Sequence, residues 1–360
     1  MNLPFAVIDR YVSRGVILRT LAGFGLLVAL ISAYYTSLLL RDAAMARIPS
    51  EHVLALLGLR DIIASEVILP TALFGAVLVT LTYLHRDREA YAMYAAGVAP
   101  ERIARTMWIL AILFSLGVAG LSTFARPWAY RTGYELQQQG TMLNAARMRA
   151  GKFYPWGDDL VLSAAAIEPG SDRLEDVFLQ RRMPGITHVI RADNGRIFAA
   201  DEQRQRIELE SGHGYWLADD GSGLDREATF TKLIYFAQAP DEPTKALGRR
   251  ARSTLELSSS NVPRDIAEFQ WRFTMPLIAL FVTMIATRLG RVLPGRSPYP
   301  RFAAGIVLYA VVFNLGTLAR TWVETGVVGP IPGLFWVPAL LAAAYWAAGR
   351  IPRLSLSRPR

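Results

Sequence analysis

Six uncharged runs constrain this chain more than any other feature of its sequence. They cover Thr20–Leu40, Val67–Leu84, Thr106–Ala125, Phe273–Thr287, Phe302–Ala319 and Thr325–Gly349. A helix that spans a bilayer needs roughly 17–25 mostly apolar residues. Five runs reach this length once flanking residues are counted, and the sixth span begins at about Gly333, after Pro330 and Pro332. The sequence therefore predicts an α-helical membrane protein with six transmembrane helices.

The arginines of the chain, which carries a formal net charge of +9, are distributed unevenly between its loops. Fifteen lie before the first span, between spans two and three, between spans four and five, and after the last span, whereas four lie in the short segments on the other side. Cytoplasmic loops carry an excess of Lys and Arg. We therefore predict that both termini are cytoplasmic, and we attribute the charge to topology, with no role in binding nucleic acid.

The one long segment between spans, from about Arg126 to Gln270, then lies outside the cytoplasm, and its pattern is typical of β-structure. Runs rich in β-branched and aromatic residues occur at Leu160–Ile167, Leu174–Gln180, Thr187–Ala192, Arg196–Ala200, Arg206–Glu210 and Thr229–Phe236. The tripeptide at 193–195 reads D-N-G, which predicts a tight hairpin between two of these strands. Short strands at this spacing predict a sandwich or a jelly roll.

These elements divide the chain into three parts. Residues 1–125 hold spans one to three, residues 126–270 hold the all-β domain with connecting helices, and residues 271–360 hold spans four to six. A helix over Arg131–Ala150 is expected to lead from the third span into the β domain.

Enzymatic chemistry finds little support in the sequence. There is no cysteine, and the four histidines have no metal-ligand spacing, so we expect no metal site and no cofactor. The segment Gly290–Ser297 is close to a phosphate-binding loop, but arginine replaces the lysine and no strand precedes it. No nucleophile motif occurs, and no catalytic residue is predicted.

Charged residues near the outer ends of the spans allow two interpretations. Arg126, Arg131 and Arg272 either anchor helices at the interface or bind the phosphates of a lipid headgroup, because the guanidinium fork matches phosphate in a bidentate manner. Glu66 lies four residues before Pro70, and an ionisable residue in a span is a functional hypothesis. Its place near the outer interface favours a solvated position.

The loop after the second span predicts a helix, a break and a second helix. Residues 86–96 allow about three helical turns at ~3.6 residues per turn, Gly97 can end the helix, and Pro100 can begin the next. Ala90, Met93, Tyr94 and Gly97 share one face, with Glu89 beside it. Such a helix is either a solvated surface or a segment that enters a groove of a cytosolic partner.

The residues from 88 to 97 read R-E-A-Y-A-M-Y-A-A-G and resemble the coupling-helix pattern S-E-x-x-x-M-x-A-x-G of the LptF/LptG permease family. Arg88 departs from the small residue usual there. Nearly the whole chain is similar to this family, including D-V-F-L at 176–179 and A-E-F-Q-W-R at 267–272. These last two features are closer to LptF, whereas the first residues, 5–11, are closer to LptG. We expect a chain most similar to LptF.

The resemblance implies a protein of the Gram-negative inner membrane with a periplasmic β-jelly roll between spans three and four. It also implies a complex with LptG, a dimer of the ATPase LptB, and LptC, which moves lipopolysaccharide from the inner membrane to a periplasmic bridge while LptB hydrolyses ATP. The residues implied in coupling to the ATPase are Arg86, Glu89, Ala90, Met93, Tyr94 and Gly97. The first basic residue at the outer end of span one is Arg41, which joins Arg126, Arg131 and Arg272 as a candidate headgroup contact.

Three other classes of protein are alternatives to this hypothesis. A signalling receptor needs a cytoplasmic output domain, and the predicted cytoplasmic segments are short. An intramembrane hydrolase needs a nucleophile or a metal site within the spans. A permease of a lipoprotein-release or other lipid ABC transporter, or an FtsX-like permease, is nearer, but these typically have four spans, so a topology map separates them.

Overall fold

The structure is a computed structural model of the chain. It describes residues 7–44, 48–141, 150–156, 160–168, 172–198, 204–218, 226–238, 248–291 and 297–350. The chain forms two compact units. The helical unit contains residues 1–33, 60–130 and 249–360, and the second unit contains residues 34–59 and 131–248, which include the strands. The three-part division expected from the sequence stays a prediction.

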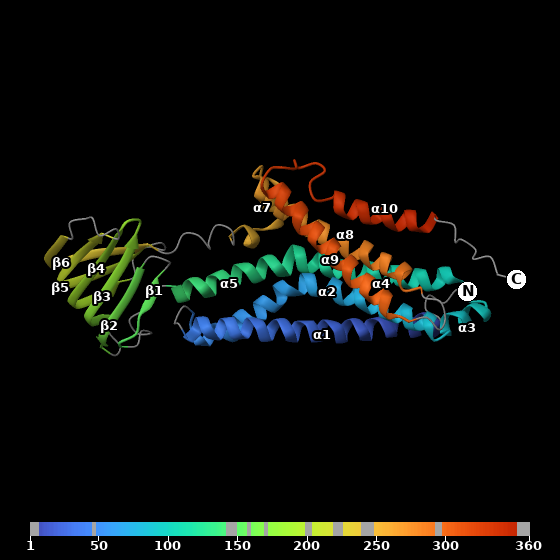
Figure 1. The fold of residues 1–360 in the computed structure, drawn as a ribbon, viewed down its shortest axis with the longest axis horizontal. Coiled ribbons are helices and arrows are strands. Elements are labelled where there is room, and N and C mark those ends of the chain that lie inside the picture. The colour runs from blue at the N-terminus through green and yellow to red at the C-terminus, as the bar shows by residue number, and fades with distance from the viewer. Residues whose placement is uncertain are drawn as a thin grey trace. The chain divides into compact units, whose positions relative to one another are not determined.

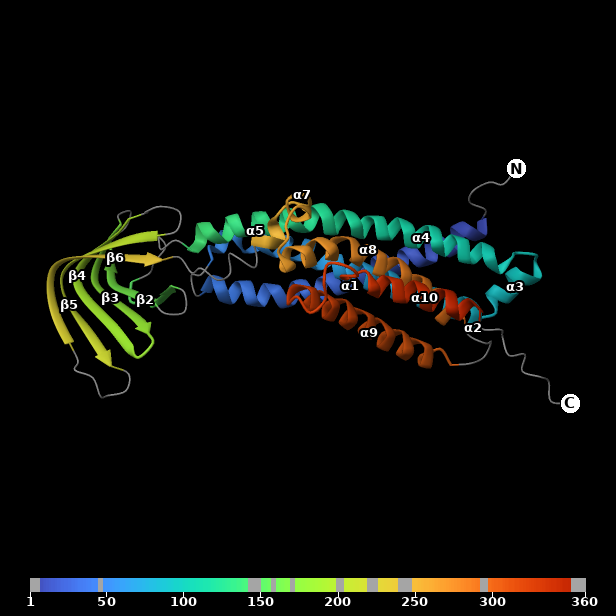
Figure 2. The ribbon, with the colours of Figure 1, turned by 90° about the horizontal axis from the view of Figure 1, so that it is seen from above.

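Long apolar helices make up most of the first unit (Figures 1 and 2). The helices of the whole chain, some of which extend into the second unit, are α1 (Val7–Ala44), α2 (Val53–Arg86), α3 (Glu89–Ala95), α4 (Pro100–Gly120), α5 (Arg126–Thr141), α7 (Thr254–Ser258), α8 (Pro263–Leu289), α9 (Tyr299–Glu324) and α10 (Trp336–Arg350), with short helices η1 (Ser50–His52) and η2 (Leu121–Ala125). Within the described residues, five helical segments are long and apolar enough to cross a membrane. The sixth expected span is α10, which is apolar but shorter. The predicted helical membrane fold is confirmed, with this difference in the length of the last helix.

The third span is one continuous helical segment, Pro100–Gln137, with an irregular turn inside it. The segment η2 between α4 and α5 is a π-helix. A π-turn inserts an extra residue into the helix and often marks a functional position. It therefore changes the direction in which the following residue, Arg126, points.

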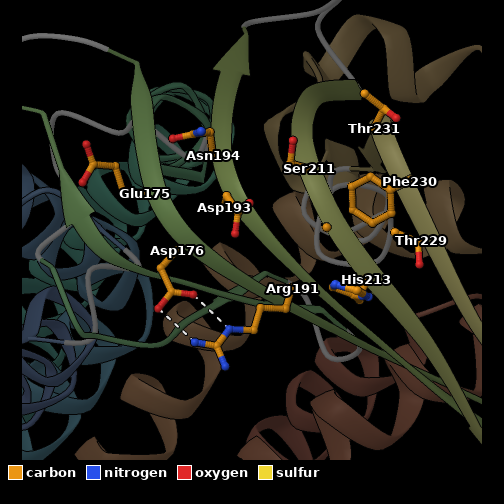
Figure 3. A pocket seen from close by; sticks show the side chains of 11 residues that line it. Glu175, Asp176, Arg191, Asp193, Asn194, Ser211, His213, Thr229, Phe230 and Thr231 are labelled. Atoms are coloured by element: carbon orange, nitrogen blue, oxygen red, sulfur yellow. Dashed lines mark hydrogen bonds and ion pairs between the residues drawn. The ribbon is translucent and has the colours of Figure 1, made fainter.

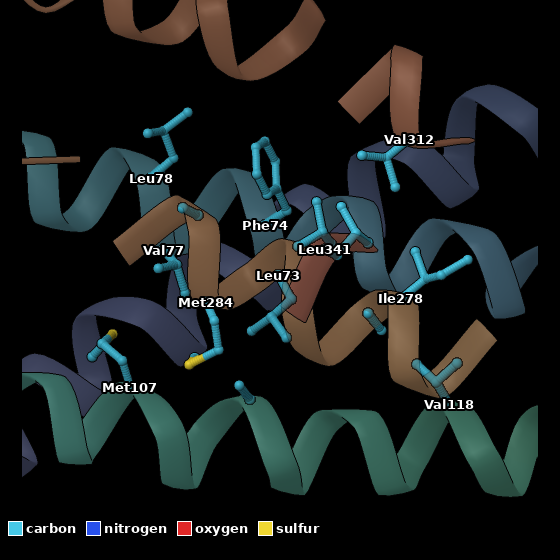
Figure 4. Close-up of a cluster of buried hydrophobic side chains, with 14 of the residues drawn as sticks. Leu73, Phe74, Val77, Leu78, Met107, Val118, Ile278, Met284, Val312 and Leu341 are labelled. Carbon is cyan, nitrogen blue, oxygen red and sulfur yellow. The ribbon is translucent and has the colours of Figure 1, made fainter. Parts of the chain in front are cut away.

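The core of the helical unit is formed mainly by α2, α4 and α8 (Figure 4). Leu73 and Val77 of α2, Met107 of α4 and Met284 of α8 are all at most 1% exposed. By contrast, only 11% of the most apolar 18-residue stretch of α1 is buried within the chain. The apolar residues of α1 therefore face a bilayer or another protein, which suits a membrane subunit better than a water-soluble bundle.

The second unit contains a six-stranded antiparallel sheet. Its strands are β1 (Tyr154–Trp156), β2 (Leu160–Ile167), β3 (Arg173–Met183), β4 (Ile186–Phe198), β5 (Arg204–Ala218) and β6 (Arg226–Gln238). They lie in sequence order, β1 to β6, so each pairs with the next. The all-β insertion is confirmed. Its strand order within the described residues is a meander, without the Greek-key crossings of a full jelly roll.

The hairpin predicted at 193–195 is wrong, because this tripeptide lies inside β4. Asn194 pairs with Glu175 of β3 and with Glu210 of β5, so two strands expected from the sequence form one. A type I′ hairpin needs positive φ at both central residues, and neither Asn194 nor Gly195 has it. The β3–β4 hairpin instead turns at Pro184-Gly185, as predicted, and Gly185 has φ +80°. The turn expected at Pro169-Gly170 lies outside the described residues.

Gly195 is needed for packing and not for a turn. A Cβ added at this position would lie 2.8 Å from Cγ2 of Val177. Gly212 on β5 is tighter still, since an added Cβ would collide with the carbonyl oxygen of Arg191. Both glycines lie on the buried face of the sheet, where the side chains of neighbouring strands leave no room.

A crease crosses four strands of this sheet. Successive strand residues normally alternate between the two faces, so buried residues are expected at every second position. On each of these strands the alternation is interrupted once, where two residues instead of one separate a buried position from the next. These positions are Leu174 and Val177 on β3, Ala192 and Gly195 on β4, Leu209 and Gly212 on β5, and the half-buried Phe230 and Leu233 on β6. The register aligns them in two rows across the sheet. Asp176 and Ser211, between the rows, have φ of 46° and 53°, so strained backbone at matched positions bends the strands together.

Candidate functional site

Helix α3 is held between α2 and α4 by turns at both ends. Arg88 precedes it in a left-handed conformation, φ 66°, and its carbonyl accepts the amide of Ala92 at 3.0 Å. Gly97 ends the helix with φ 85°, and its amide donates to the carbonyl of Tyr94 at 3.0 Å. Pro100 is the first residue of α4. The predicted helix, break and second helix are present, but the first helix is shorter than residues 86–96. It covers Glu89–Ala95, and Arg86 is the last residue of α2.

The apolar face of α3 packs against the chain's own core. Ala90 is 0% exposed, and Met93 and Tyr94 are half-buried against the core of the helical unit. Tyr94 also approaches the ring of His85, with 3.4 Å between its hydroxyl and Nε2. In this conformation the chain's own core covers Ala90, and the periodicity that marks a buried face cannot say which molecule buries it. Contact of this face with another protein stays a prediction.

The opposite side of α3 is open to a partner. Glu89 is exposed, and Tyr91 is 39% exposed. The Glu89 carboxylate accepts a hydrogen bond from the hydroxyl of Tyr11, at 2.9 Å. Among the described residues no cation lies within ion-pair distance of Glu89, so most of the hydrogen-bonding capacity of the carboxylate is available. Arg86 lies nearby in the sequence. Its Nε is 3.8 Å from Oδ1 of Asp87, and its guanidinium lies over the ring of Tyr83.

An ion pair fixes the helices on either side of this element. The Arg102 guanidinium at the start of α4 donates to both carboxylate oxygens of Asp9 in α1, at 2.9–3.3 Å. Thr106 donates to the same carboxylate at 3.1 Å. Asp9 is 7% exposed. The contact ties α1 to α4, the helix that follows α3 in the chain. Sequence reasoning missed Asp9, although an acid in the first turn of the first span was a signal.

Two of the four candidate headgroup arginines are enclosed in a cluster of buried charges. The side chain of Arg126 is 5% exposed, and its Nε lies 3.1 Å from Oε2 of Glu66. Its Nη1 lies 3.0 Å from Oε1 of Glu268. Arg272 is 0% exposed and lies 3.6 Å from the same Glu268 oxygen.

Arg320 of α9 completes the cluster. Its Nη2 lies 2.8 Å from Oε2 of Glu268, and its Nε lies 2.7 Å from Glu324. Three arginines thus meet three glutamates, drawn from α2, α5, α8 and α9. Buried charges need such partners, because an unpaired ion costs several kcal/mol.

The expectation of a solvated Glu66 is wrong. Glu66 is 3% exposed, and the buried hydroxyl of Ser122 donates to it at 2.5 Å. Ser122 belongs to the π-helix η2, and Arg126 is the first residue after this helix. The irregular turn therefore presents both groups to Glu66, which sequence spacing did not predict.

Arg272 also fastens the segment before α8. Its guanidinium donates to the hydroxyl of Thr254 in α7 at 2.7 Å and to the carbonyl of Arg252 at 2.9 Å. Close by, Asp265 accepts from Arg249 and Arg252 at 2.8 and 3.1 Å. These contacts anchor the chain as it returns to the helical unit. In this conformation Arg126 and Arg272 are buried and paired with Glu268, so a lipid phosphate reaches them only if the cluster opens.

The other two candidate arginines belong to the second unit. Arg41 lies in the last turn of α1 and is exposed, and Arg131 lies in α5 and is also exposed. The four candidates therefore do not form one site within either unit.

The crease of the sheet forms a polar hollow of about 810 Å³ (Figure 3). Arg191 donates to both oxygens of Asp176 at 3.0 and 3.1 Å. These hydrogen bonds raise the pKa of the Arg191 guanidinium. The ion pair joins β3 to β4 across the bend and lies on the solvent-exposed face of the sheet. The apolar side, lined by buried residues such as Leu179 and Ile190, is the opposite face.

Comparison with known proteins decides the family. A model of the lipopolysaccharide export system permease LptF/LptG family matches residues 10–350. The chain belongs to this family. The lipopolysaccharide export system permease protein LptF of Escherichia coli K12 is 24% identical over 323 residues, which cover 88% of this chain and 87% of the relative. LptF of Escherichia coli O157:H7 and of Shigella flexneri match to the same extent.

Membership of the LptF/LptG family, and the greater similarity to LptF, were expected from the sequence and are confirmed. The family is one of permeases, so the chain is a membrane subunit of an export system. The motif A-E-x-x-W-R that helped the identification contains Glu268 and Arg272, a glutamate and an arginine at i and i+4. That spacing was the available signal for part of the buried cluster, because such residues meet on one helix face. Arg320 and Ser122 gave no signal.

Proposed function

We propose that this chain is the LptF subunit of an ABC transporter that extracts lipopolysaccharide from the inner membrane and passes it to a periplasmic bridge. Its partners are LptG, a dimer of the ATPase LptB, and LptC. The family match over residues 10–350 supports the class of cargo. The arginine asymmetry of the loops supports cytoplasmic termini and a periplasmic β domain.

Helix α3 carries the proposal for coupling to ATP hydrolysis. Its exposed Glu89, held by Tyr11 alone among the described residues, suits an arginine in a groove of the ATPase. The buried Ala90 and half-buried Met93 and Tyr94 transmit force into the chain, since they pack on its core. Arg86 and Gly97 border this contact. ATP-driven movement of the ATPase pair thus tilts α3, and the Asp9–Arg102 pair carries the tilt to α1 and α4.

The four candidate arginines for binding a lipid headgroup differ in their exposure, two being exposed and two buried. Arg41 and Arg131 are exposed and are the candidates for contact with lipopolysaccharide phosphates in the observed conformation. Arg126 and Arg272 join them only in a state in which Glu66 and Glu268 release them. Photo-crosslinking to lipopolysaccharide in Arg41→Gln and Arg131→Gln complexes tests the first pair, and unchanged crosslinking in both would reject it.

Replacement of Glu89 tests the coupling proposal. Truncation of one partner of a buried charge pair costs roughly 2–5 kcal/mol, so Glu89→Ala should weaken co-purification of the ATPase or uncouple ATP hydrolysis from lipid release in reconstituted vesicles. Glu89→Arg should be worse, because it adds repulsion. Glu101→Ala is a matched control, since Glu101 is an exposed glutamate in the first turn of α4. Wild-type values for Glu89→Arg in all these assays would reject the coupling role.

A further inference from the structure

A second hollow, of about 730 Å³, lies in the helical unit between α1, the end of α2 and the start of α3. This volume is within the range of small-ligand sites, roughly 300–1,000 Å³. Its lining is divided by chemistry. Arg14 and Arg19 supply cations, Asp87 and Glu89 supply carboxylates, and apolar residues such as Leu18 line the rest.

The arginines and carboxylates of the hollow, all of which the structure describes, do not pair with one another. Oδ1 of Asp87 instead lies 3.8 Å from Nε of Arg86, and Glu89 accepts from the hydroxyl of Tyr11. Among the described residues neither Arg14 nor Arg19 has a carboxylate within ion-pair distance. The Arg19 guanidinium donates to the carbonyl of Gly15 at 3.2 Å and to the hydroxyl of Thr80 at 3.3 Å. Each guanidinium has five N–H donors, so donors remain for an anionic group.

The charges are also ordered along α1. Glu89 is at the level of Tyr11, because the two are hydrogen-bonded. The Arg19 guanidinium is at the level of Gly15, four residues further along the helix. At 1.5 Å per residue the separation is about 6 Å. Beyond Arg19 the long uncharged run Thr20–Leu40 begins. The order from the helix end inward is therefore carboxylate, guanidinium, apolar surface.

We propose that this hollow binds a phosphoethanolamine phospholipid of the leaflet that α3 borders. The ammonium contacts Asp87, the phosphate accepts from Arg14 and Arg19, and the acyl chains follow Leu18 and the apolar run. Glu89 stays available for its proposed contact with the ATPase. An ammonium, a phosphate and acyl chains follow one another in the same order in this lipid. An anionic phospholipid suits the arginines alone and is repelled by the two carboxylates. Because Glu89 also lines the hollow, the bound lipid adjoins the helix assigned to coupling.

The test compares lipid retention by the purified permease–ATPase complex. Native mass spectrometry is applied after incubation in detergent with equal amounts of phosphatidylethanolamine, phosphatidylcholine and phosphatidylglycerol that share the same acyl chains. The wild-type complex should retain phosphatidylethanolamine about tenfold over each of the others, a ratio that corresponds to about 1.4 kcal/mol. Equal retention, or a preference for phosphatidylglycerol, overturns the proposal.

Variants locate the lipid. The double variant Arg14→Gln, Arg19→Gln should lose most of the retained phosphatidylethanolamine, and Asp87→Asn should lower the preference over phosphatidylcholine, whose quaternary ammonium donates no hydrogen bond. Arg10→Gln is the matched control, since Arg10 is exposed on α1 one turn before Arg14 and does not line the hollow. An equal loss in Arg10→Gln, or none in the double variant, overturns the site.

A measurement on the unaltered chain guards against loss of folding in the variants. Phosphatidylethanolamine with a photoactivatable group near its glycerol should label residues 11–22 of the wild-type chain within the complex. Labelling confined to other segments overturns the proposal. None of these readouts depends on lipopolysaccharide transport, so their failure is distinct from failure of the proposed function.

Discussion

Glu268 of α8 and Glu89 of α3 are two glutamates of one helical unit with opposite surroundings. Glu268 is 0% exposed and is contacted by Arg126, Arg272 and Arg320. Glu89 is exposed and accepts a single hydrogen bond from Tyr11. Helix α7, which is bound by Arg272 of the Glu268 cluster, and helix α3, which contains Glu89, lie toward opposite ends of the helical unit (Figure 1).

The difference teaches how one side chain serves two purposes. A carboxylate that its own chain neutralises holds helices together and has nothing left for a partner. A carboxylate left exposed contributes little to the fold, since exposed pairs are worth about 0–1 kcal/mol, but it keeps its charge for another protein. The comparison therefore predicts a stability role at one end and a binding role at the other.

The largest effect should come from Glu268→Gln. The amide leaves the buried Arg126 and Arg272 and the partly buried Arg320 short of negative charge, and breaking a buried pair costs roughly 3–5 kcal/mol. We expect a large fall in the thermal midpoint of the detergent-solubilised chain and a lower yield of folded protein. An unchanged midpoint would mean that the cluster does not stabilise the fold, and the comparison would fail.

Glu66→Gln should destabilise the chain less than Glu268→Gln. Glu66 contacts one arginine, and the amide retains an acceptor for Ser122. A hydrogen bond to a charged group is worth about 1.5–3 kcal/mol, so a loss within this range is expected in the same thermal measurement. A loss greater than that of Glu268→Gln would show that the cluster is centred on α2 instead of α8.

A double-mutant cycle distinguishes loss of the ion pair from loss of packing as the cause of these destabilisations. Residues in one ion-pair network show coupling of about 0.5–3 kcal/mol, so Glu66→Gln combined with Arg126→Gln should cost measurably less than the sum of the two single changes. Additive losses in the free energy of unfolding would show that packing, and not charge, explains the single variants.

The smallest effect on stability should come from Glu89→Gln. Because the carboxylate is exposed, we expect a change of about 0–1 kcal/mol in the free energy of unfolding, together with weaker association with the ATPase. A loss of stability as large as that of Glu268→Gln would remove the distinction between the two ends.

Local patterns in the sequence predicted much of the fold and part of the site. The uncharged runs predicted the helices, because a long apolar segment must leave water, and Gly97 and Pro100 marked the ends of helices through their own backbone preferences. Strand runs such as Leu160–Ile167 were found as predicted. The D-N-G at 193–195 misled, because a turn preference is weak beside the pairing of β4 with both neighbours.

What the sequence by itself determined is therefore what depends on each segment alone: the apolar helices, the insertion of an all-β domain, the helix that carries Glu89, and the family. The tertiary structure alone decided which charges meet. Arg126 and Glu268 are 142 residues apart in the chain, Glu66 depends on a π-turn in another helix, and the face of α3 that seemed open is covered by the chain itself. Such contacts depend on how separate helices pack, and no local pattern encodes the partner that packing brings.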